Sequence, residues 1–220
     1  MKKINSLPAF QQLLSLFVAF IIGMIICRIC YSLSLRYIFL LWNLFLGWIP
    51  FQLSLYLSKN NGGKWKNWLL LVAWLLFFPN ALYIITDFVH LGSKTNVPVW
   101  YDAVLLFTCA TTGLMMAFAS LYKVEIFLMK SMSKGVASKL VIACLFLGSF
   151  GVYLGRFLRW NSWDIISNPL QLSSEIGVRF WSPVHHYRTW AITLLLTVLF
   201  SLLYFGIKRM PAYVHSLKKQ

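Results

Sequence analysis

The chain has 220 residues, of which 60% are hydrophobic, 17% are aromatic and only 11% are charged, and its formal net charge is +15. An average soluble domain has about 25% charged residues, so this composition excludes an ordinary soluble protein and indicates a membrane protein. The positive charge suits a surface beside anionic lipid headgroups. Because the basic residues are scattered over several segments, we expect no nucleic acid partner.

Six apolar segments are long enough to cross a membrane as helices, since one span needs about 20 apolar residues. They cover about residues 10–27, 36–57, 67–88, 100–122, 138–158 and 188–207. The longest stretch between them, residues 159–187, is too short to form a core of its own. We therefore predict an all-α fold with a single transmembrane domain over residues 1–220, built as a bundle of six helices. The first span is expected to be an uncleaved anchor.

Lysine and arginine are distributed unequally between the two ends of these spans. If the N-terminus is cytoplasmic, thirteen basic residues fall on the inner side and seven on the outer side. The positive-inside rule then predicts that both termini are cytoplasmic. The acidic residues follow the opposite pattern, because all but Glu125 fall on the outer side: Asp87, Asp102, Asp164 and Glu175.

The third span carries a polar stripe on one face. Asn80, Tyr83, Asp87 and His90 follow one another at spacings of three, four and three, which place them within an arc of about 80° on a helix. Contact between this stripe and lipid would be costly, so we expect it to face other helices or a water-filled cleft. Pro79 beside the stripe is expected to kink the helix.

The fourth and fifth spans combine small residues with charged ones. Asp102 begins the fourth span on the same face as several small residues, and Gly151 and Gly155 give the fifth span a G-x-x-x-G face. Arg159 continues that face one turn further on, and Arg156 lies to its side. We therefore expect these charged side chains to point into the bundle and not toward lipid.

The segment between the fifth and sixth spans contains a helix start, because Asn168 can cap a helix that begins at Pro169. We predict a short amphipathic helix there, lying in the headgroup layer with Trp181 as an anchor. Two roles fit this helix, a lid over a site and a linker that dips into the interface. In the sixth span, hydroxyls at every fourth residue from Thr189 to Ser201 predict a packing ridge bonded back to its own helix.

Three segments carry a resemblance to a known family: FFPNALYIITDFVHL (77–91), VWYDAVLL (99–106) and GVYLGRFLRWNSWD (151–164). They resemble the signature blocks of a bacterial family of multi-pass membrane proteins, domain of unknown function 1361. The resemblance extends over roughly residues 40–205. It implies a protein that crosses the plasma membrane of a bacterium several times, with no assigned activity and no established catalytic residues.

The charged residues at the predicted outer ends allow three interpretations. In the first, they have no ligand and only hold the helices of a structural or accessory subunit together. Asp87 or Asp102 then pairs with Arg159, while Asp164 pairs with Arg156 or caps a helix. Such partners are expected for any arginine buried at this depth, because an unpaired charge would cost several kcal/mol.

In the second interpretation, the outer ends bind an anionic phospholipid or a lipid-linked headgroup, as part of envelope lipid or glycan assembly. Two arginines three residues apart can converge on one phosphate through their planar donors. If a reaction takes place, His90 with Asp87 one turn before it is the candidate general acid or base. The predicted ligand-binding residues are Arg156, Arg159, Asn161, Asp164, Asp102 and Asn80.

The third interpretation is an ion-coupled transporter of small solutes, since Asn80, Asp87 and Asp102 accompany a proline-broken helix. Against it, the middle of the spans is nearly bare of ionisable residues and no internal repeat is evident. Metal ligation by Asp87 and His90 lacks a zinc motif, so we expect no metal and no cofactor. The expected partners are the bilayer and its anionic headgroups, with a membrane protein or a second copy of the chain as further candidates.

Overall fold

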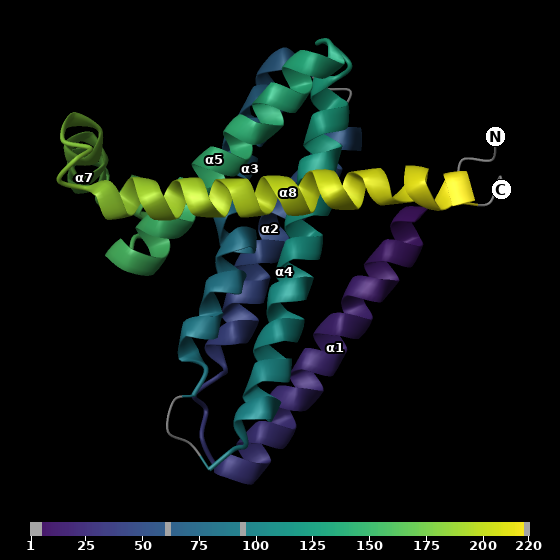
Figure 1. Cartoon of the computed structure of the whole chain (residues 1–220), viewed down its shortest axis with the longest axis vertical. Helices are drawn as coiled ribbons and strands as arrows, with labels where there is room; N and C mark the ends of the chain where they lie inside the picture. The colour runs from purple at the N-terminus through teal and green to yellow at the C-terminus, as the bar shows by residue number, and fades with distance from the viewer. Residues whose placement is uncertain (1–5, 60–62, 93–95, 218–220) are drawn as a thin grey trace.

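The computed structural model describes residues 6–59, 63–92 and 96–217. The described residues are 86% helical and contain no strand, so the predicted all-α fold is confirmed. The elements (Figure 1) are α1 (Ser6–Ser32), α2 (Phe39–Lys59), α3 (Lys64–Tyr83), the 3-10 helix η1 (Ile84–His90), α4 (Val99–Leu128), α5 (Lys134–Leu158), α6 (Asp164–Ser167), α7 (Pro169–Trp181) and α8 (Tyr187–Leu217).

Six stretches of helix in the described part are long and apolar enough to cross a membrane. They are Ala9–Ser32, Phe39–Lys59, Lys64–His90, Val99–Leu128, Lys134–Leu158 and Tyr187–Pro211. Each contains most of one predicted span, so the six predicted spans are confirmed as helices of sufficient length. The third stretch differs from the others because it joins α3 to η1 and changes from α to 3-10 winding at Ile84.

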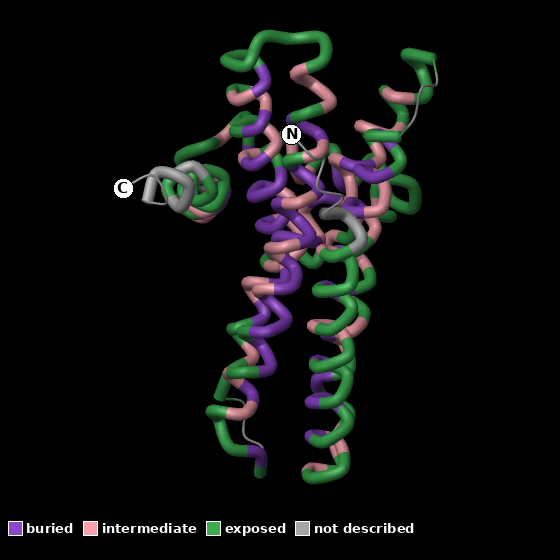
Figure 2. The backbone as a smooth tube through the Cα atoms, turned by 90° about the vertical axis from the view of Figure 1, so that its right-hand side faces the viewer, coloured by how far each residue is buried: buried purple, intermediate pink, exposed green. Residues whose placement is uncertain are grey.

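α4 is the central helix of the bundle. It contacts α1, α2, α3, η1 and α5, and residues along its whole length are buried, among them Leu105, Ala117 and Leu121. Figure 2 shows exposed residues along the outward side of α1, whereas buried residues gather where the helices meet. This distribution suits a membrane protein, in which apolar side chains cover both the interior and the lipid-facing surface.

α8 lies crosswise to α4 in both views of the backbone and packs mainly against α5 (Figures 1 and 2). Its first turns join α5 and α7 through a group of aromatic rings. The ring of Trp190 lies 5.9 Å from that of Phe150 and 4.9 Å from that of Phe180, measured between centroids. The start of α8 is therefore fixed to α5 and to the amphipathic helix α7.

The ridge of hydroxyls on α8 is bonded to its own helix only in part. Thr197 Oγ1 donates to the carbonyl of Thr193 at 2.7 Å, as predicted. The hydroxyls of Thr189 and Thr193 are buried and have no hydrogen-bond partner among the described residues, which the sequence does not predict. The prediction for Asn168 is also corrected, because its side chain accepts no hydrogen bond from the first turn of α7, which begins at Pro169.

α5 approaches α3 closely because glycines face it. A Cβ atom at Gly151 would lie 2.5 Å from Cγ of Pro79, and one at Gly148 would lie 2.9 Å from Cδ1 of Leu82. No side chain larger than hydrogen fits at Gly151 unless the helices move apart. The predicted small-residue face of the fifth span therefore packs against the proline-containing face of the third.

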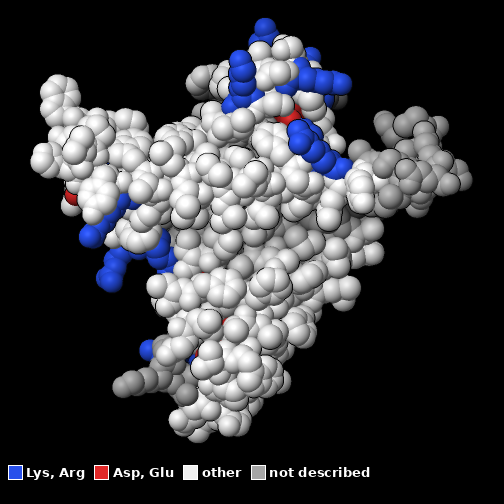
Figure 3. Space-filling model, viewed as in Figure 1, with Lys and Arg blue, Asp and Glu red and all other residues white. Residues whose placement is uncertain are grey.

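The two ends of the bundle differ in the residues that they carry. The motif end is the end that holds His90, Val99 and Leu158, and we name it so because the three family-like blocks meet there. The lysine end is the opposite end, which holds Lys59 and Lys134. On the face shown in Figure 3, most lysines and arginines gather at the lysine end, and a smaller group lies near the start of α8. The motif end is where the candidate site residues lie.

One buried ion pair ties α8 to α4 at the lysine end. Glu125 is 1% exposed, and its carboxylate accepts hydrogen bonds from Tyr204 Oη at 2.7 Å and from Lys208 Nζ at 2.6 Å. The carboxylate is thus fully partnered, as a buried charge requires. This contact fixes the crosswise α8 to the central helix.

Candidate functional site

Arg156, in the last turn of α5, binds the side chains of η1. Its Nη2 donates to Oδ1 of Asp87, and its Nε donates to Thr86 Oγ1 at 2.8 Å. The guanidinium also lies over the ring of Tyr83, with 4.1 Å between Cζ and the ring centroid. Arg156 is therefore held by an ion pair, a hydroxyl and an aromatic face at once, and it connects the first family-like block to the third.

Asp87 is bound through both of its carboxylate oxygens. Its second oxygen, Oδ2, accepts a hydrogen bond from Asn43 Nδ2 at 2.9 Å, which brings α2 into the same cluster. The residue is only 1% exposed, so these partners replace the water that a buried carboxylate loses. The sequence predicts that Asp87 or Asp102 pairs with Arg159, and for Asp87 this is wrong because Arg156 is the partner.

His90 completes the cluster. Its Nε2 lies 3.3 Å from Nη1 of Arg156, and because arginine can only donate, a hydrogen bond between them requires Nε2 as the acceptor. The two candidates for acid–base chemistry, Asp87 and His90, thus face Arg156 inside the protein. No group of three His, Cys, Asp or Glu side chains that could hold a metal ion occurs within the described ranges.

A second buried ion pair joins α1 to α4. Arg28 Nε donates to Asp102 Oδ1 at 2.8 Å and Nη2 donates to Oδ2 at 3.2 Å, which is a bidentate pair. The guanidinium lies over the ring of Tyr37, 4.1 Å from its centroid, and Nη1 has no partner among the described residues. The predicted pair between Asp102 and Arg159 is therefore wrong. Asp102 does point into the bundle, as predicted.

Arg159 lies outside both clusters. It follows α5 in the left-handed conformation, with φ of 62°, and the N–H groups of Arg159 and Trp160 both donate to the carbonyl of Leu154. Its side chain is exposed and forms no ion pair or hydrogen bond with the residues that the structure describes. The predicted inward orientation of Arg159 is wrong, and its guanidinium does not share the surroundings of Arg156.

Asp164 closes the turn that follows α5. It accepts a hydrogen bond from the backbone N–H of Asn161 at 2.7 Å and another from Ser167 Oγ at 3.0 Å. The backbone hydrogen bond from Asn161, more than any other contact, holds the pKa of Asp164 below its ordinary value. Of its two predicted roles, the pair with Arg156 is not formed, and Asp164 instead binds backbone at the start of α6.

Ser162 fixes the same turn to α3. Its Oγ donates to the carbonyl of Leu76 at 3.2 Å and accepts a hydrogen bond from Asn80 Nδ2 at 2.9 Å. Asn80 Nδ2 also donates to the carbonyl of Phe77 at 3.1 Å. Both carbonyls belong to the turn before Pro79, where proline interrupts the helical hydrogen bonds. The turn after α5 is thereby inserted against the proline-containing part of α3.

A cavity of about 420 Å³ lies between α2, α3, α5 and the segment that runs from Trp160 into α7. Toward the middle of the spans its walls are apolar, with Leu75, Phe146 and Leu147. Toward the motif end it is lined by Tyr83, Trp160 and Asn161, and α7 closes one side. The size lies within the usual range for a small-molecule site.

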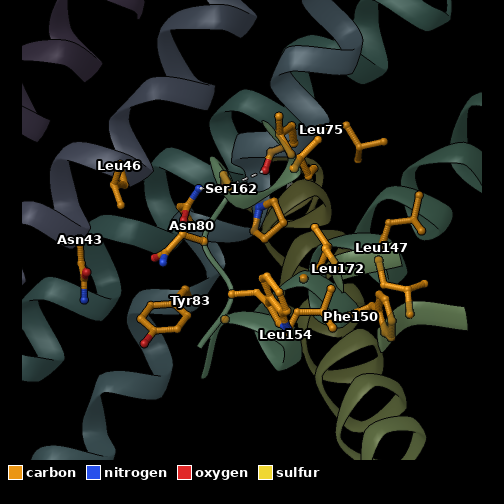
Figure 4. Close-up of a pocket in the computed structure, with 18 of the residues that line it drawn as sticks. Asn43, Leu46, Leu75, Asn80, Tyr83, Leu147, Phe150, Leu154, Ser162 and Leu172 are labelled. Atoms are coloured by element: carbon orange, nitrogen blue, oxygen red, sulfur yellow. Dashed lines mark hydrogen bonds between the residues drawn. The ribbon is translucent and has the colours of Figure 1, made fainter. Parts of the chain in front are cut away.

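The polar and apolar walls of this cavity face each other. In Figure 4, Asn43, Asn80 and Tyr83 lie on one side, and the opposite side is formed by Leu147, Phe150, Leu154 and Leu172. Two of the predicted ligand-binding residues, Asn80 and Asn161, line the cavity. The others, Arg156, Arg159, Asp164 and Asp102, are absent from its walls, although Arg159 precedes the lining residue Trp160.

Several residues of these clusters are not predicted from the sequence. Arg28 is the clearest case, and a signal for it exists, because an arginine that directly follows an apolar span needs a partner at that depth. Asn43 carries no charge that would single it out in the sequence, yet it binds Asp87 and lines the cavity. Thr86 gives no sequence signal, since its role depends on the rotation of η1.

Comparison with known proteins gives a family but no characterised relative. Residues 42–203 match a family model described as protein of unknown function (DUF1361). No curated protein and no solved structure matches the chain. The matched region contains both Asp87 and Arg156 together with every residue that lines the cavity, whereas Arg28 lies outside it. The chain therefore belongs to the DUF1361 family.

Proposed function

We propose that the protein lies in the plasma membrane of a bacterium with both termini in the cytoplasm and the motif end in the outer leaflet. The distribution of basic residues supports this orientation, since thirteen belong to the side of the termini and seven to the opposite side. The family resemblance of the sequence blocks supports the bacterial membrane. The cavity then opens at the depth of outer-leaflet lipid.

In this proposal the cavity binds a lipid-like amphiphile with an anionic headgroup, as a step in envelope lipid or glycan assembly. The observation that carries it is the division of the cavity into an apolar wall around Leu147 and Phe150 and a polar wall around Asn80 and Tyr83. A lipid from the outer leaflet would enter with its acyl chain against the apolar wall and its headgroup toward the polar wall. No catalytic step is part of the proposal.

Arg159 is the residue that would contact the anionic group. It is exposed, it precedes the cavity residue Trp160, and no described acidic residue neutralises it. A planar guanidinium suits phosphate oxygens. Arg156 has a different role in this proposal: because it is bound to Asp87 and lies over Tyr83, it is a positioning residue that holds the polar wall in place.

A purely structural role is the second candidate, and a specific observation favours it. Asp87 and Asp102, the buried carboxylates of the motif end, pair with arginines from other helices. These charges are therefore explained without any ligand. The lipid-binding role and the structural role differ only in whether the cavity binds a ligand, since a structural subunit needs no polar cavity wall.

The test is native mass spectrometry of the purified full chain with added phosphatidylglycerol. Leu147→Trp fills part of the cavity and should lower the retained lipid several-fold. Ile142→Trp is the matched control, because Ile142 lies on the same helix, is 45% exposed against 46% for Leu147, and does not line the cavity. Equal retention by the two variants would overturn the proposal and leave the structural role.

A further inference from the structure

We infer that the headgroup taken up by this cavity carries hydroxyl groups as hydrogen-bond donors, as a glycerol or a sugar does, in addition to its anionic group. The inference rests on the proposed function, and it specifies the ligand class of the same site. It depends on which polar atoms the cavity wall leaves without a partner.

The amide groups of Asn43 and Asn80 have a fixed orientation. Asn43 Nδ2 donates to the Asp87 carboxylate, and Asn80 Nδ2 donates to a backbone carbonyl. Carboxylate and carbonyl oxygens only accept, so the nitrogen of each amide must face them and the oxygen of each must face away. Neither Oδ1 atom has a hydrogen bond with another described residue, and both side chains line the cavity.

Tyr83 adds a third polar atom to the same wall. Its ring is held beneath the guanidinium of Arg156, and its Oη has no hydrogen bond with the described residues. Figure 4 shows Tyr83 on the side of Asn43 and Asn80, with its hydroxyl directed away from the apolar wall. The wall therefore presents two acceptors and one hydroxyl that can donate or accept.

An acyl chain cannot satisfy these atoms. A polar group that loses water without gaining a hydrogen bond is destabilised, and within the hydrocarbon layer there is little water to compensate. A headgroup that brings donors gains hydrogen bonds at the same atoms, and each is worth about a fivefold change in affinity. The wall thus favours ligands with donors over ligands that have only apolar or accepting groups.

The donor is a hydroxyl and not an ammonium group because the cavity wall offers no countercharge. None of the described residues that line the cavity is Asp or Glu, and the nearby Asp87 carboxylate is already paired with Arg156. An ammonium group would therefore lose its water without gaining an ion pair, whereas a neutral hydroxyl needs only a hydrogen bond. The aromatic residues Trp42 and Trp160 also line the cavity and provide flat apolar surfaces against which a polyol or sugar can pack.

Four lipids with identical acyl chains separate charge from donors. Phosphatidylglycerol has both features, phosphatidylmethanol has only the charge, glucosyl diacylglycerol has only the hydroxyls, and phosphatidylcholine has neither. Their retention by the full chain is compared by native mass spectrometry in competition. We expect the retention of phosphatidylglycerol to be about fivefold higher than that of phosphatidylmethanol, which corresponds to one hydrogen bond. It should be about threefold higher than that of glucosyl diacylglycerol, which corresponds to one exposed ion pair.

The outcomes distinguish this inference from the proposed function. If phosphatidylmethanol is retained as well as phosphatidylglycerol, the inference is overturned, while an advantage of both over phosphatidylcholine still supports an anionic site. If glucosyl diacylglycerol equals phosphatidylglycerol, the hydroxyl inference stands and the anionic part of the proposed function fails. Phosphatidylethanolamine, whose donor is a cation, is expected to bind no better than phosphatidylcholine, and stronger binding would contradict the choice of hydroxyl.

A single-atom change gives the second measurement. Tyr83→Phe removes an oxygen that binds no described residue, so the fold should persist, and it should lower retention of phosphatidylglycerol about fivefold but leave phosphatidylmethanol unchanged. Tyr153→Phe is the control, because Tyr153 lies on α5, stacks on Phe157 and does not line the cavity. Equal effects of the two variants on phosphatidylglycerol would contradict the inference.

Discussion

The two buried arginine–aspartate pairs of the motif end use the same chemistry in different surroundings. Arg28 and Asp102 are 1% and 4% exposed in their side chains and join α1 to α4 away from the cavity. Arg156 is 13% exposed, and the neighbours of its pair with Asp87 include Asn43 and Tyr83 of the cavity wall. An intramembrane ion pair therefore does not by itself indicate a ligand site; its neighbours decide whether it has a role beyond stability.

Removing one partner of the first pair should have the largest effect on stability. Asp102→Asn leaves the Arg28 guanidinium buried without a countercharge and should lower the free energy of unfolding by about 3 kcal/mol. Chemical unfolding in mixed micelles measures this loss. Replacing both partners, Arg28→Met with Asp102→Leu, should restore most of it with lipid retention unchanged, and a double variant as unstable as the single one would refute the structural assignment.

Separating α5 from α3 should disturb the second pair without touching the first. Gly151→Ala places a methyl group 2.5 Å from Pro79 Cγ and should cost about 2 kcal/mol through overpacking. The same unfolding titration measures it. Gly206→Ala on α8, where no described atom beyond the adjacent residues and the helix's own backbone lies within 4 Å of the added carbon, should be neutral or stabilising, since alanine favours helix. Similar losses in both variants would contradict the close packing.

Breaking the second pair should cost less stability and more binding. Asp87→Asn should lower the free energy of unfolding by about 1 kcal/mol, because Arg156 is partly exposed and keeps Thr86 and the face of Tyr83. Retention of phosphatidylglycerol per folded molecule should fall, since Asn43 and Tyr83 lose their fixed positions. Unchanged retention of phosphatidylglycerol would show that the pair of Arg156 and Asp87 only stabilises the fold, as the pair of Arg28 and Asp102 does.

Arg159 offers a case in which stability and binding should move in opposite directions. Arg159→Gly relieves a left-handed residue with φ of 62° and should raise the free energy of unfolding by about 0.5 kcal/mol. The same change removes the exposed guanidinium and should lower phosphatidylglycerol retention. The control replaces two exposed arginines by the same residue, Arg159→Gln and Arg36→Gln. Only Arg159→Gln should lower the retention of phosphatidylglycerol.

The smallest expected effect is the pH dependence contributed by Asp164. The pKa of its carboxyl is lowered in the folded protein by hydrogen bonds, chiefly from the Asn161 backbone, so its stabilising contribution is present above the unfolded pKa of about 4 and is lost as the pH falls below it. Wild type should therefore have a higher unfolding midpoint than Asp164→Asn at about pH 5, and this difference should disappear at about pH 3. A constant difference across this range would contradict it.

The fold is predictable from the sequence because spans of this length have few alternatives. Apolar segments of about 20 residues must form helices in lipid, and this requirement predicts α1 to α5 and α8 without knowledge of their neighbours. The start of α7 is also predictable, because Pro169 suits the first turn of a helix. The crosswise position of α8 is not, since it depends on which aromatic rings of α5 and α7 it meets.

The pairing of charges is harder to predict than their depth. Asp87, Asp102 and Arg156 are correctly expected to avoid lipid, because that follows from the cost of burying charge. Their partners depend on helix neighbours and rotation, which periodicity alone does not give. Arg159 shows the same limit: its position one turn after Gly155 predicts an inward face only if α5 continues, and α5 ends at Leu158.

The 3-10 winding of η1 explains how Arg156 reaches two partners. Residues three apart eclipse each other in this winding, so Asp87 and His90 stand in one line above the guanidinium, whereas α winding would turn them about 60° apart. Rewinding the seven residues as α-helix would also shorten the span by roughly 3.5 Å. The contacts of Arg156 thus stabilise the 3-10 conformation of this segment. We expect faster amide hydrogen exchange over Ile84–His90 in Arg156→Ala, because these contacts are then lost.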